Sequence, residues 1–122
     1  MNMATTRKIS GGKYKKSRKR KAYETRGKQS LTFLGETKKK PKRGMGGVIK
    51  TVLLKSNIVN VMDPKTKKAQ KATIKNVLEV PSNRFLARKN AIVKGAIIET
   101  SLGKARVTNR PSQESTVQAV LI

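Results

Sequence analysis

The sequence predicts a mainly β protein, a small β-barrel with a basic, extended N-terminal arm. Two observations predict the barrel: β-branched residues are frequent from Val48 onward, and short apolar runs recur there at roughly regular spacing between turn signals. A third observation predicts the arm, because residues 1–44 hold 16 of the 30 basic residues but only two of the six acidic ones. We therefore expect a basic extension at residues 1–47, disordered when free, and a barrel domain at residues 48–122.

The whole chain is strongly basic. It has 122 residues, and its 30 lysines and arginines against six aspartates and glutamates give a net charge of +24. This excess is larger than solubility requires, so it favours a polyanionic partner whose binding weakens steeply with salt. The chain has no cysteine and no histidine, which excludes disulfides, thiolate zinc sites and histidine-dependent catalysis. We expect no enzyme activity, no cofactor and no metal site.

Membrane surfaces are anionic too, so a membrane-active cationic polypeptide is one alternative. However, no apolar run approaches the roughly 18 to 20 residues that span a bilayer. The basic arm also lacks the apolar stripe of an interfacial helix, and no signal-peptide h-region follows the first basic residues. We therefore expect no membrane partner.

The densest charge in the arm lies between Arg7 and Lys28. From residue 13 to residue 21, seven of nine residues are basic. Like charges repel and little apolar surface is available to offset the entropy of ordering the backbone, so we expect the arm to be disordered when free. It would become ordered against a polyanion of defined shape, and structured RNA is the leading expectation. A solvated tail that only keeps the protein soluble is the alternative.

Two further stretches complete the extension. Residues 31–35 form a short apolar island, which we expect to dock on the domain, although it could instead fill an RNA crevice. Residues 38–47 are charged, interrupted by Pro41 and rich in glycine, so they are predicted to be loop. The glycines do not form a nucleotide-binding loop, because no Gly-Lys-Ser/Thr ending follows them.

The first strands of the predicted barrel lie at residues 48–54 and 58–62, which are rich in β-branched side chains and end at a turn signal. Residues 69–80 form the next strand. There, Ala72, Ile74 and Leu78 alternate with polar residues, which is typical of a half-buried strand.

Four short strands are predicted in the remainder of the domain, at residues 91–93, 96–100, 105–109 and 116–122. Turns are predicted at residues 94–95, 101–104 and 110–113. The chain has only four aromatic residues, so we expect an aliphatic core.

Residues 82–90 are the one stretch predicted to be helical. Ser82 or Asn83 can cap it, and two turns place Arg84 and Arg88 four residues apart on one face. Together with Lys89 they form a predicted phosphate clamp, because the arginine fork suits bidentate phosphate contacts. A merely solvated helix face is the alternative.

Four other residues have more than one interpretation. Tyr14 and Tyr23 could stack on unpaired bases, or pack on RNA backbone or on the domain. Arg106 and Arg110 flank a strand end and a proline loop, where they could reach RNA or cap carbonyl groups. The sequence leaves these alternatives open.

The predicted site residues are all RNA-binding, and none is catalytic. They are Arg7, Lys8, Lys13, Tyr14, Lys15, Lys16, Arg18, Lys19, Arg20, Lys21, Tyr23, Arg26, Lys28, Lys38, Lys39, Lys40, Lys42, Arg43, Arg84, Arg88, Lys89, Arg106 and Arg110.

Several separate motifs follow one another over nearly the whole chain. They are Gly11-Gly12-Lys13-Tyr14-Lys15-Lys16-Ser17-Arg18, Asn60-Val61-Met62-Asp63-Pro64-Lys65-Thr66, Pro81-Ser82-Asn83-Arg84 with Ala87-Arg88, Lys94-Gly95-Ala96-Ile97-Ile98, and Gly103-Lys104-Ala105-Arg106-Val107-Thr108-Asn109-Arg110-Pro111. Together they resemble the archaeal and eukaryotic small-subunit ribosomal protein eight-e family in its short archaeal form. There are two departures from the family pattern: Ser112 stands where the family commonly has a glycine, and Phe85-Leu86 replaces a more polar aromatic pair.

The resemblance implies a β-barrel with a basic N-terminal extension and no catalytic role. Its expected partners are small-subunit ribosomal RNA and neighbouring ribosomal proteins, with no small-molecule substrate, and its expected location is the cytoplasmic ribosome. The charge alone would suit duplex DNA equally well. An architectural DNA-binding protein is therefore the alternative from another functional class.

Overall fold

The centre of the molecule is a closed barrel of five strands. The computed structural model describes residues 7–15, 18–25, 27 and 29–122. In the order β4-β5-β7-β8-β9, the barrel strands are Ile58–Met62, Ala69–Glu79, Ile97–Thr100, Gly103–Val107 and Gln118–Leu121. β4 closes the barrel by pairing with β9 in parallel, and the other neighbouring strands are antiparallel. The predicted mainly β fold with a small barrel is confirmed.

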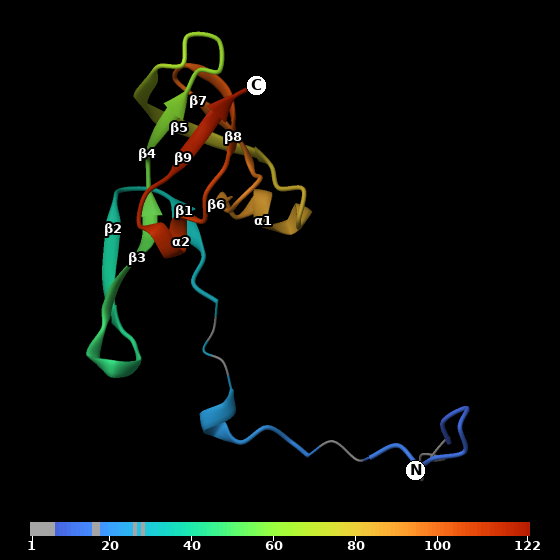
Figure 1. Cartoon of the computed structure of the whole chain (residues 1–122). Coiled ribbons are helices and arrows are strands. Elements are labelled where there is room, and N and C mark those ends of the chain that lie inside the picture. Colours follow the sequence, from blue (N-terminus) through green and yellow to red (C-terminus); the bar gives the residue numbers. More distant parts are fainter. Residues whose placement is uncertain (1–6, 16–17, 26, 28) are drawn as a thin grey trace.

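A second sheet lies at one end of the barrel (Figure 1). In the order β2-β3-β1-β6, its strands are Lys38–Arg43, Ile49–Ser56, Thr32–Leu34 and Ala91–Ile92. Only Asn57 separates β3 from β4, so one nearly continuous stretch of chain joins the two sheets. The strands predicted at residues 48–54 and 91–93 therefore belong to this second sheet rather than to the barrel.

The two sheets share one aliphatic core, as the composition predicts. Strands alternate their side chains between two faces, and those of Val59, Ile98 and Val107 fill the barrel interior. Leu53 of β3 and Ile92 of β6 belong to the same buried cluster. The second sheet is thus fixed to the barrel by apolar packing as well as by chain connection.

The apolar island at residues 31–35 docks on this core, as expected. Its central part is β1, which pairs with β3 in parallel and with β6 antiparallel. Thr32 is buried, and its Oγ1 donates a hydrogen bond of 2.9 Å to the carbonyl oxygen of Leu53. β1 is therefore part of the folded body.

The prediction of loop for residues 38–43 was wrong. These residues form β2, which pairs antiparallel with β3. Pro41 is tolerated because β2 is an edge strand, whose outer side has no ladder partner, and lysine is common on such edges. At the tip of the hairpin, Gly46 and Gly47 have φ angles of 73° and 76°, which glycine adopts without strain.

One predicted core residue on β5 is also wrong. Ala72 and Ile74 are buried as predicted, but Leu78 is 41% exposed and Val77 only 4%. The register between β5 and β7 shifts on both sides of Val77. Such bulges change which residues face inward, so the simple alternation fails beyond Ile74.

Two short helices flank the sheets. The predicted helix is confirmed as α1, Arg84–Arg88, and the Asn83 Oδ1 atom caps it by accepting a 3.0 Å hydrogen bond from the N–H of Phe85. The turn predicted at residues 110–113 is instead α2, Pro111–Glu114, with proline in the first turn, where its missing N–H is not needed. Within the described residues, no helix is long and apolar enough to cross a membrane.

We predict that Thr32→Val lowers the free energy of unfolding by about 1–2 kcal/mol, because the side chain keeps its shape while a buried hydrogen bond is lost. Urea denaturation at fixed salt measures this change. Thr51→Val, on the exposed part of β3, is the control and should have little effect. Equal losses in the two variants would mean that β1 does not contribute to the cooperative fold.

Candidate nucleic-acid interface

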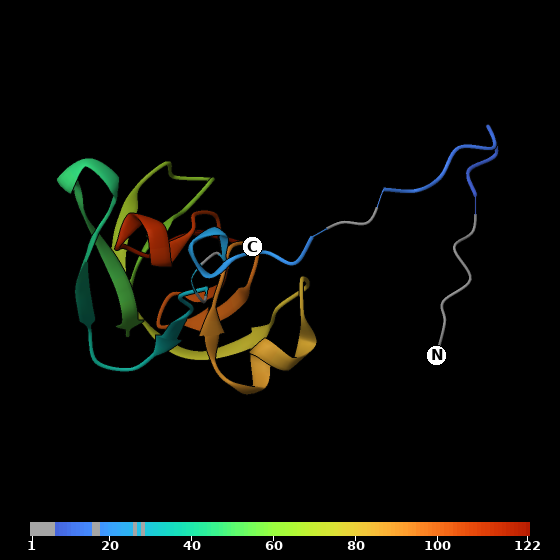
Figure 2. The same cartoon turned by 90° about the horizontal axis from the view of Figure 1, so that it is seen from below.

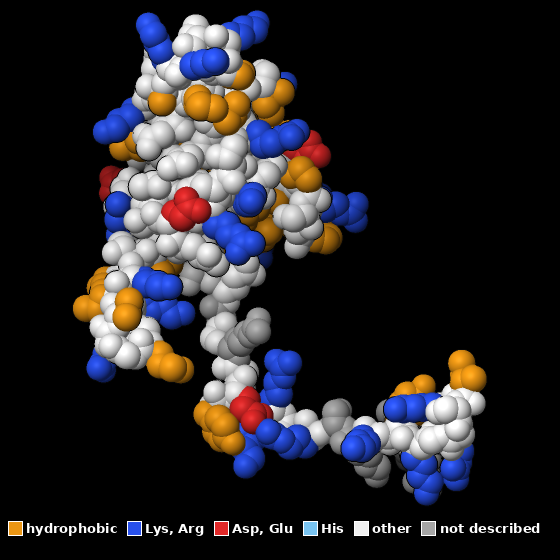
Figure 3. Space-filling model, viewed as in Figure 1, with side chains coloured by type: hydrophobic (Ala, Val, Ile, Leu, Met, Phe, Trp, Pro, Cys, Tyr) orange, Lys and Arg blue, Asp and Glu red, His pale blue; other side chains and the backbone are white. Residues whose placement is uncertain are grey.

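The hairpin of β2 and β3 projects from the body of the protein (Figure 1), and some of its lysine and arginine side chains are visible beside hydrophobic ones in Figure 3. Five of the six β2 residues are lysine or arginine, and all six are exposed. Strand alternation places Lys40 and Lys42 on one face and Lys39 and Arg43 on the other. Both faces of the hairpin can therefore contact phosphate groups.

Cross-strand pairing adds charge to this hairpin. Lys42 lies opposite Lys50, and Lys38 lies opposite Lys55. Like charges directly opposite each other destabilise a β ladder, and residues 38–56 contain no carboxylate to compensate them. An anionic partner would remove this repulsion.

The tip of the hairpin is apolar. Met45 is 97% exposed, and Val48 and Ile49 are also exposed. The N–H of Gly44 donates a 2.6 Å hydrogen bond to the carbonyl oxygen of Val48, which closes the tip. The hairpin thus combines a charged stem with a small apolar end.

The described residues before β1 extend away from the barrel (Figure 1). Residues 7–13 form a tight turn, in which the N–H of Lys8 donates to the carbonyl of Gly12 and the N–H of Gly11 donates to the carbonyl of Lys8, both at 2.9 Å. Arg7, Lys8, Lys13 and the other described cations of this segment lie on its surface. Whether this arm is disordered when free stays a prediction.

A short 3₁₀ turn, Ala22–Glu24, interrupts the arm. The Glu24 carboxylate accepts hydrogen bonds from the Arg18 guanidinium and, at 3.1 Å, from the N–H of Lys21. The guanidinium first, and the backbone N–H second, hold the pKa of Glu24 below its ordinary value. One acidic residue thus organises the arm locally while neutralising only one of its cations.

The two tyrosines are exposed in this segment, which does not fit packing on the domain. Lys8 Nζ lies 5.6 Å from the centre of the Tyr14 ring, and Lys21 Nζ lies 5.9 Å from that of Tyr23. A cation near each ring places positive charge beside an aromatic surface. Stacking on bases and packing on RNA backbone both stay open.

The cations of α1 form a separate group. Arg84, Arg88 and Lys89 are exposed, and the Arg84 guanidinium carbon lies 5.2 Å from the centre of the Phe85 ring. Two perpendicular views show α1 and the β2–β3 hairpin on opposite sides of the barrel (Figures 1 and 2). The predicted site residues therefore do not form one continuous patch.

The two remaining predicted arginines lie in different places. Arg106 is on β8, and Arg110 immediately precedes α2. Among the described residues, neither side chain caps a carbonyl group. Arg110 shares a cleft of about 640 Å³ with Lys94, and residues 29–32 line the same cleft.

Three of the predicted site residues, Lys16, Arg26 and Lys28, lie outside the described residues. Conversely, the structure adds Lys50, Lys55 and Lys94 to the candidate interface. Lys50 and Lys55 lie on β3, opposite β2. The sequence could have placed them beside the β2 lysines only if residues 38–43 had been predicted as a strand.

Two further acidic side chains, those of Asp63 and Glu114, accept local hydrogen bonds. Asp63 accepts 2.9 Å hydrogen bonds from the N–H of Lys65 and the Oγ1 of Thr66, which together lower its pKa. Glu114 accepts a 3.0 Å hydrogen bond from the Asn109 side chain. In the part of the chain that the structure describes, no three metal-binding side chains gather. Both carboxylates are therefore held in local hydrogen bonds.

Comparison with known proteins agrees with the motif pattern. The family model of ribosomal protein S8e matches residues 2–122. The small ribosomal subunit protein eS8 of Methanococcus aeolicus is 47% identical, over 95% of this chain and 91% of that protein. The proteins of the same name from Sulfurisphaera tokodaii and Methanocella arvoryzae are 44% and 40% identical, over 95% and 97% of this chain and 91% and 94% of their own lengths. The family resemblance is confirmed.

We predict that Lys50→Glu stabilises the free protein, because it places a carboxylate opposite Lys42 where two like charges now meet. The free energy of unfolding should rise by about 0.2–1 kcal/mol at low salt, and the gain should shrink as salt is added. Urea denaturation at two salt concentrations measures both effects.

Lys19→Glu is the matched control, since it changes the net charge equally but lies in the arm, outside both sheets. An equal gain in the two variants would attribute the effect to net charge rather than to the cross-strand pair.

Proposed function

Because this chain belongs to the ribosomal protein S8e family, we propose that it is a structural constituent of the small ribosomal subunit that binds and stabilises folded small-subunit ribosomal RNA. The observation that carries the RNA-binding part is the β2–β3 hairpin, an ordered ribbon with lysines on both faces and uncompensated like-charge pairs. Its partners are this RNA and neighbouring ribosomal proteins, and its location is the ribosome in the cytoplasm.

The hairpin binds by neutralising phosphates. Its cations lie on a backbone already ordered by pairing with β3, so little conformational entropy is lost when RNA is bound. A narrow ribbon that is basic on both faces can lie between two RNA segments and reduce their mutual repulsion. Its apolar tip, formed by Met45, Val48 and Ile49, then lies deepest between them.

The basic extension, residues 1–47, binds in two ways. Its C-terminal part is ordered beforehand, because β1 and β2 belong to the second sheet. The arm before β1 instead becomes ordered on the RNA surface and pays its entropy cost there. Its dense lysines and arginines supply phosphate contacts, and Tyr14 and Tyr23 lie where they can pack on bases or backbone.

A second RNA contact lies at α1. Arg84, Arg88 and Lys89 are exposed on the side of the barrel opposite the hairpin (Figure 2). Two separate basic surfaces on one rigid body can hold two RNA segments at a fixed distance. Arg106 and Arg110 extend these contacts over the barrel surface. The protein therefore acts as a clamp for RNA structure and not as a catalyst.

We predict that Lys40→Ala combined with Lys42→Ala weakens binding to small-subunit ribosomal RNA and reduces its salt dependence. Losing two phosphate contacts should lower the slope of log binding constant against log salt by about 1.5. Filter binding over a salt series with the transcribed ribosomal RNA of Methanococcus aeolicus measures the slope, and duplex DNA of equal length is the competitor.

The control combines Lys65→Ala with Lys68→Ala, which removes the same charge from the turn between β4 and β5, at the far end of the barrel from the hairpin (Figure 1). It should leave the slope nearly unchanged. An equal slope for both double variants would remove the hairpin from the interface. Equal affinity for RNA and duplex DNA would favour an architectural DNA-binding protein.

A further inference from the structure

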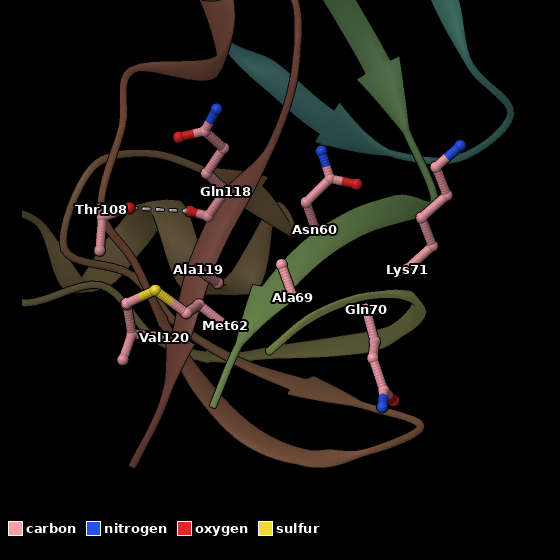
Figure 4. A pocket seen from close by; sticks show the side chains of 9 residues that line it. All are labelled: Asn60, Met62, Ala69, Gln70, Lys71, Thr108, Gln118, Ala119 and Val120. Atoms are coloured by element: carbon pink, nitrogen blue, oxygen red, sulfur yellow. Dashed lines mark hydrogen bonds between the residues drawn. The ribbon is translucent and has the colours of Figure 1, made fainter. Parts of the chain in front are cut away.

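A hollow of about 490 Å³ lies on the outer surface of the barrel (Figure 4). It is lined by Asn60, Met62, Ala69, Gln70, Lys71, Thr108, Gln118, Ala119 and Val120. These residues include three side-chain amides and one lysine, but no carboxylate. The hollow thus combines apolar side chains with amides and has only one cation in its lining.

Strand register explains how the hollow is built. β4 lies between β5 and β9, so Asn60 has Lys71 on one side and Gln118 on the other. Two residues further along β4, Met62 lies between Ala69 of β5 and Val120 of β9. Because alternate residues of a strand face the same side, a polar row and an apolar row lie next to each other on the outer surface.

The polar row presents free amide groups. In Figure 4 the side chains of Asn60 and Gln118 stand on the same surface at neighbouring strands. The backbone of Gln118 is occupied, since its N–H donates 3.0 Å to Asn109 Oδ1 and its carbonyl accepts from Thr108 Oγ1 at 3.4 Å. Among the described residues, neither the Asn60 nor the Gln118 amide has a hydrogen-bond partner. Each offers a donor and an acceptor side by side.

The apolar row provides a surface for a flat ring. Met62 is 45% exposed, and in Figure 4 its thioether lies next to Val120. A methionine side chain is polarizable and adapts to aromatic surfaces. Cations border the hollow: Lys71 ends the polar row, and Arg106 of β8 pairs with Val120 beside the apolar row.

We propose that this hollow binds a single unpaired base of the RNA, a contact that rests on the proposed RNA-binding function. The amides of Asn60 and Gln118 hydrogen-bond the edge of the base, because paired donors and acceptors are what base edges present. Met62 and Val120 pack on the face of the base, and Lys71 and Arg106 contact the flanking phosphates. A phosphate alone would need cations, not amides, at the centre of the site.

Chemical footprinting of the full-length protein on transcribed small-subunit ribosomal RNA of Methanococcus aeolicus tests the proposal. Hydroxyl radicals report contacts to the RNA backbone, and dimethyl sulfate reports the Watson–Crick edges of unpaired adenine and cytosine. Unpaired guanine and uracil are probed in the same way with a carbodiimide reagent. The variant combines Asn60→Ala with Gln118→Ala, and the control combines Asn57→Ala with Gln113→Ala, two other exposed amides.

The wild-type protein and the control should protect one or a few unpaired base edges, and the Asn60/Gln118 variant should lose that protection while keeping the backbone footprint. Its dissociation constant should rise about tenfold, the amount expected for one good bidentate base contact. Met62→Lys provides a second test. It adds a cation, yet it should also lose the base protection because the apolar surface is gone.

Two results would overturn the proposal, and they can be told apart. If the wild-type protein leaves no backbone footprint, the RNA-binding function itself fails, and the base contact fails with it. If the backbone footprint is present but no base protection depends on Asn60, Gln118 or Met62, only the base contact fails. In that case the hollow would be exposed to solvent or would contact a neighbouring protein.

Discussion

Repulsion between like charges is the constraint on which this structure depends. The chain carries a net charge of +24, and at least three of its six carboxylates are occupied in local turns and caps rather than paired across the cationic surfaces. The core that opposes this repulsion is small and aliphatic. A domain of this size buries only a modest fraction of its surface on folding, so its free energy of unfolding is correspondingly small. The pairing of Lys42 with Lys50 shows that the free protein retains unfavourable contacts within an ordered hairpin. Such contacts are stable only because the rest of the fold supports them, and they favour an anionic partner.

The fold separates the task of stability from the task of binding. Residues that face inward from both sheets form one cluster, in which Leu53 and Ile92 join the second sheet to the barrel. Because β3 runs almost directly into β4, the hairpin is held by the barrel rather than hinged to it. The hairpin therefore presents its cations from a well-supported backbone, whereas the arm is predicted to be ordered by its partner. In such a protein the hairpin loses little conformational entropy on binding, and the extended arm can contact RNA far from the barrel.

Local sequence patterns predicted much of this fold, but they did not predict which strands pair or in what register. The strand at residues 58–62, the helix capped by Asn83 and the aliphatic core follow from side-chain chemistry that acts within a few residues. β2 was missed because lysines and a proline give it no strand propensity; it exists through pairing with β3, a contact that no local pattern encodes. Leu78 was misplaced because a bulge against β7 alters the alternation. The cross-strand contact of Lys50, and the polar and apolar rows on the outer surface of the barrel, can be recognised only once the strand register is known.

Charge and hydrogen bonding serve different purposes in such a protein. Contacts from lysine and arginine to phosphate give affinity, but they are available on any folded RNA and so do not select a position. If both basic surfaces bind RNA as proposed, their positions on opposite sides of the barrel would add selectivity, since only RNA segments at the right separation could occupy both. The proposed base contact at the hollow lined by amides would add a further condition, because an exposed base edge would have to reach Asn60 and Gln118 together. In the proposed function, affinity arises at the hairpin and the arm, while selection of a single position arises on the barrel, where the strand register brings side chains from β4, β5, β8 and β9 together.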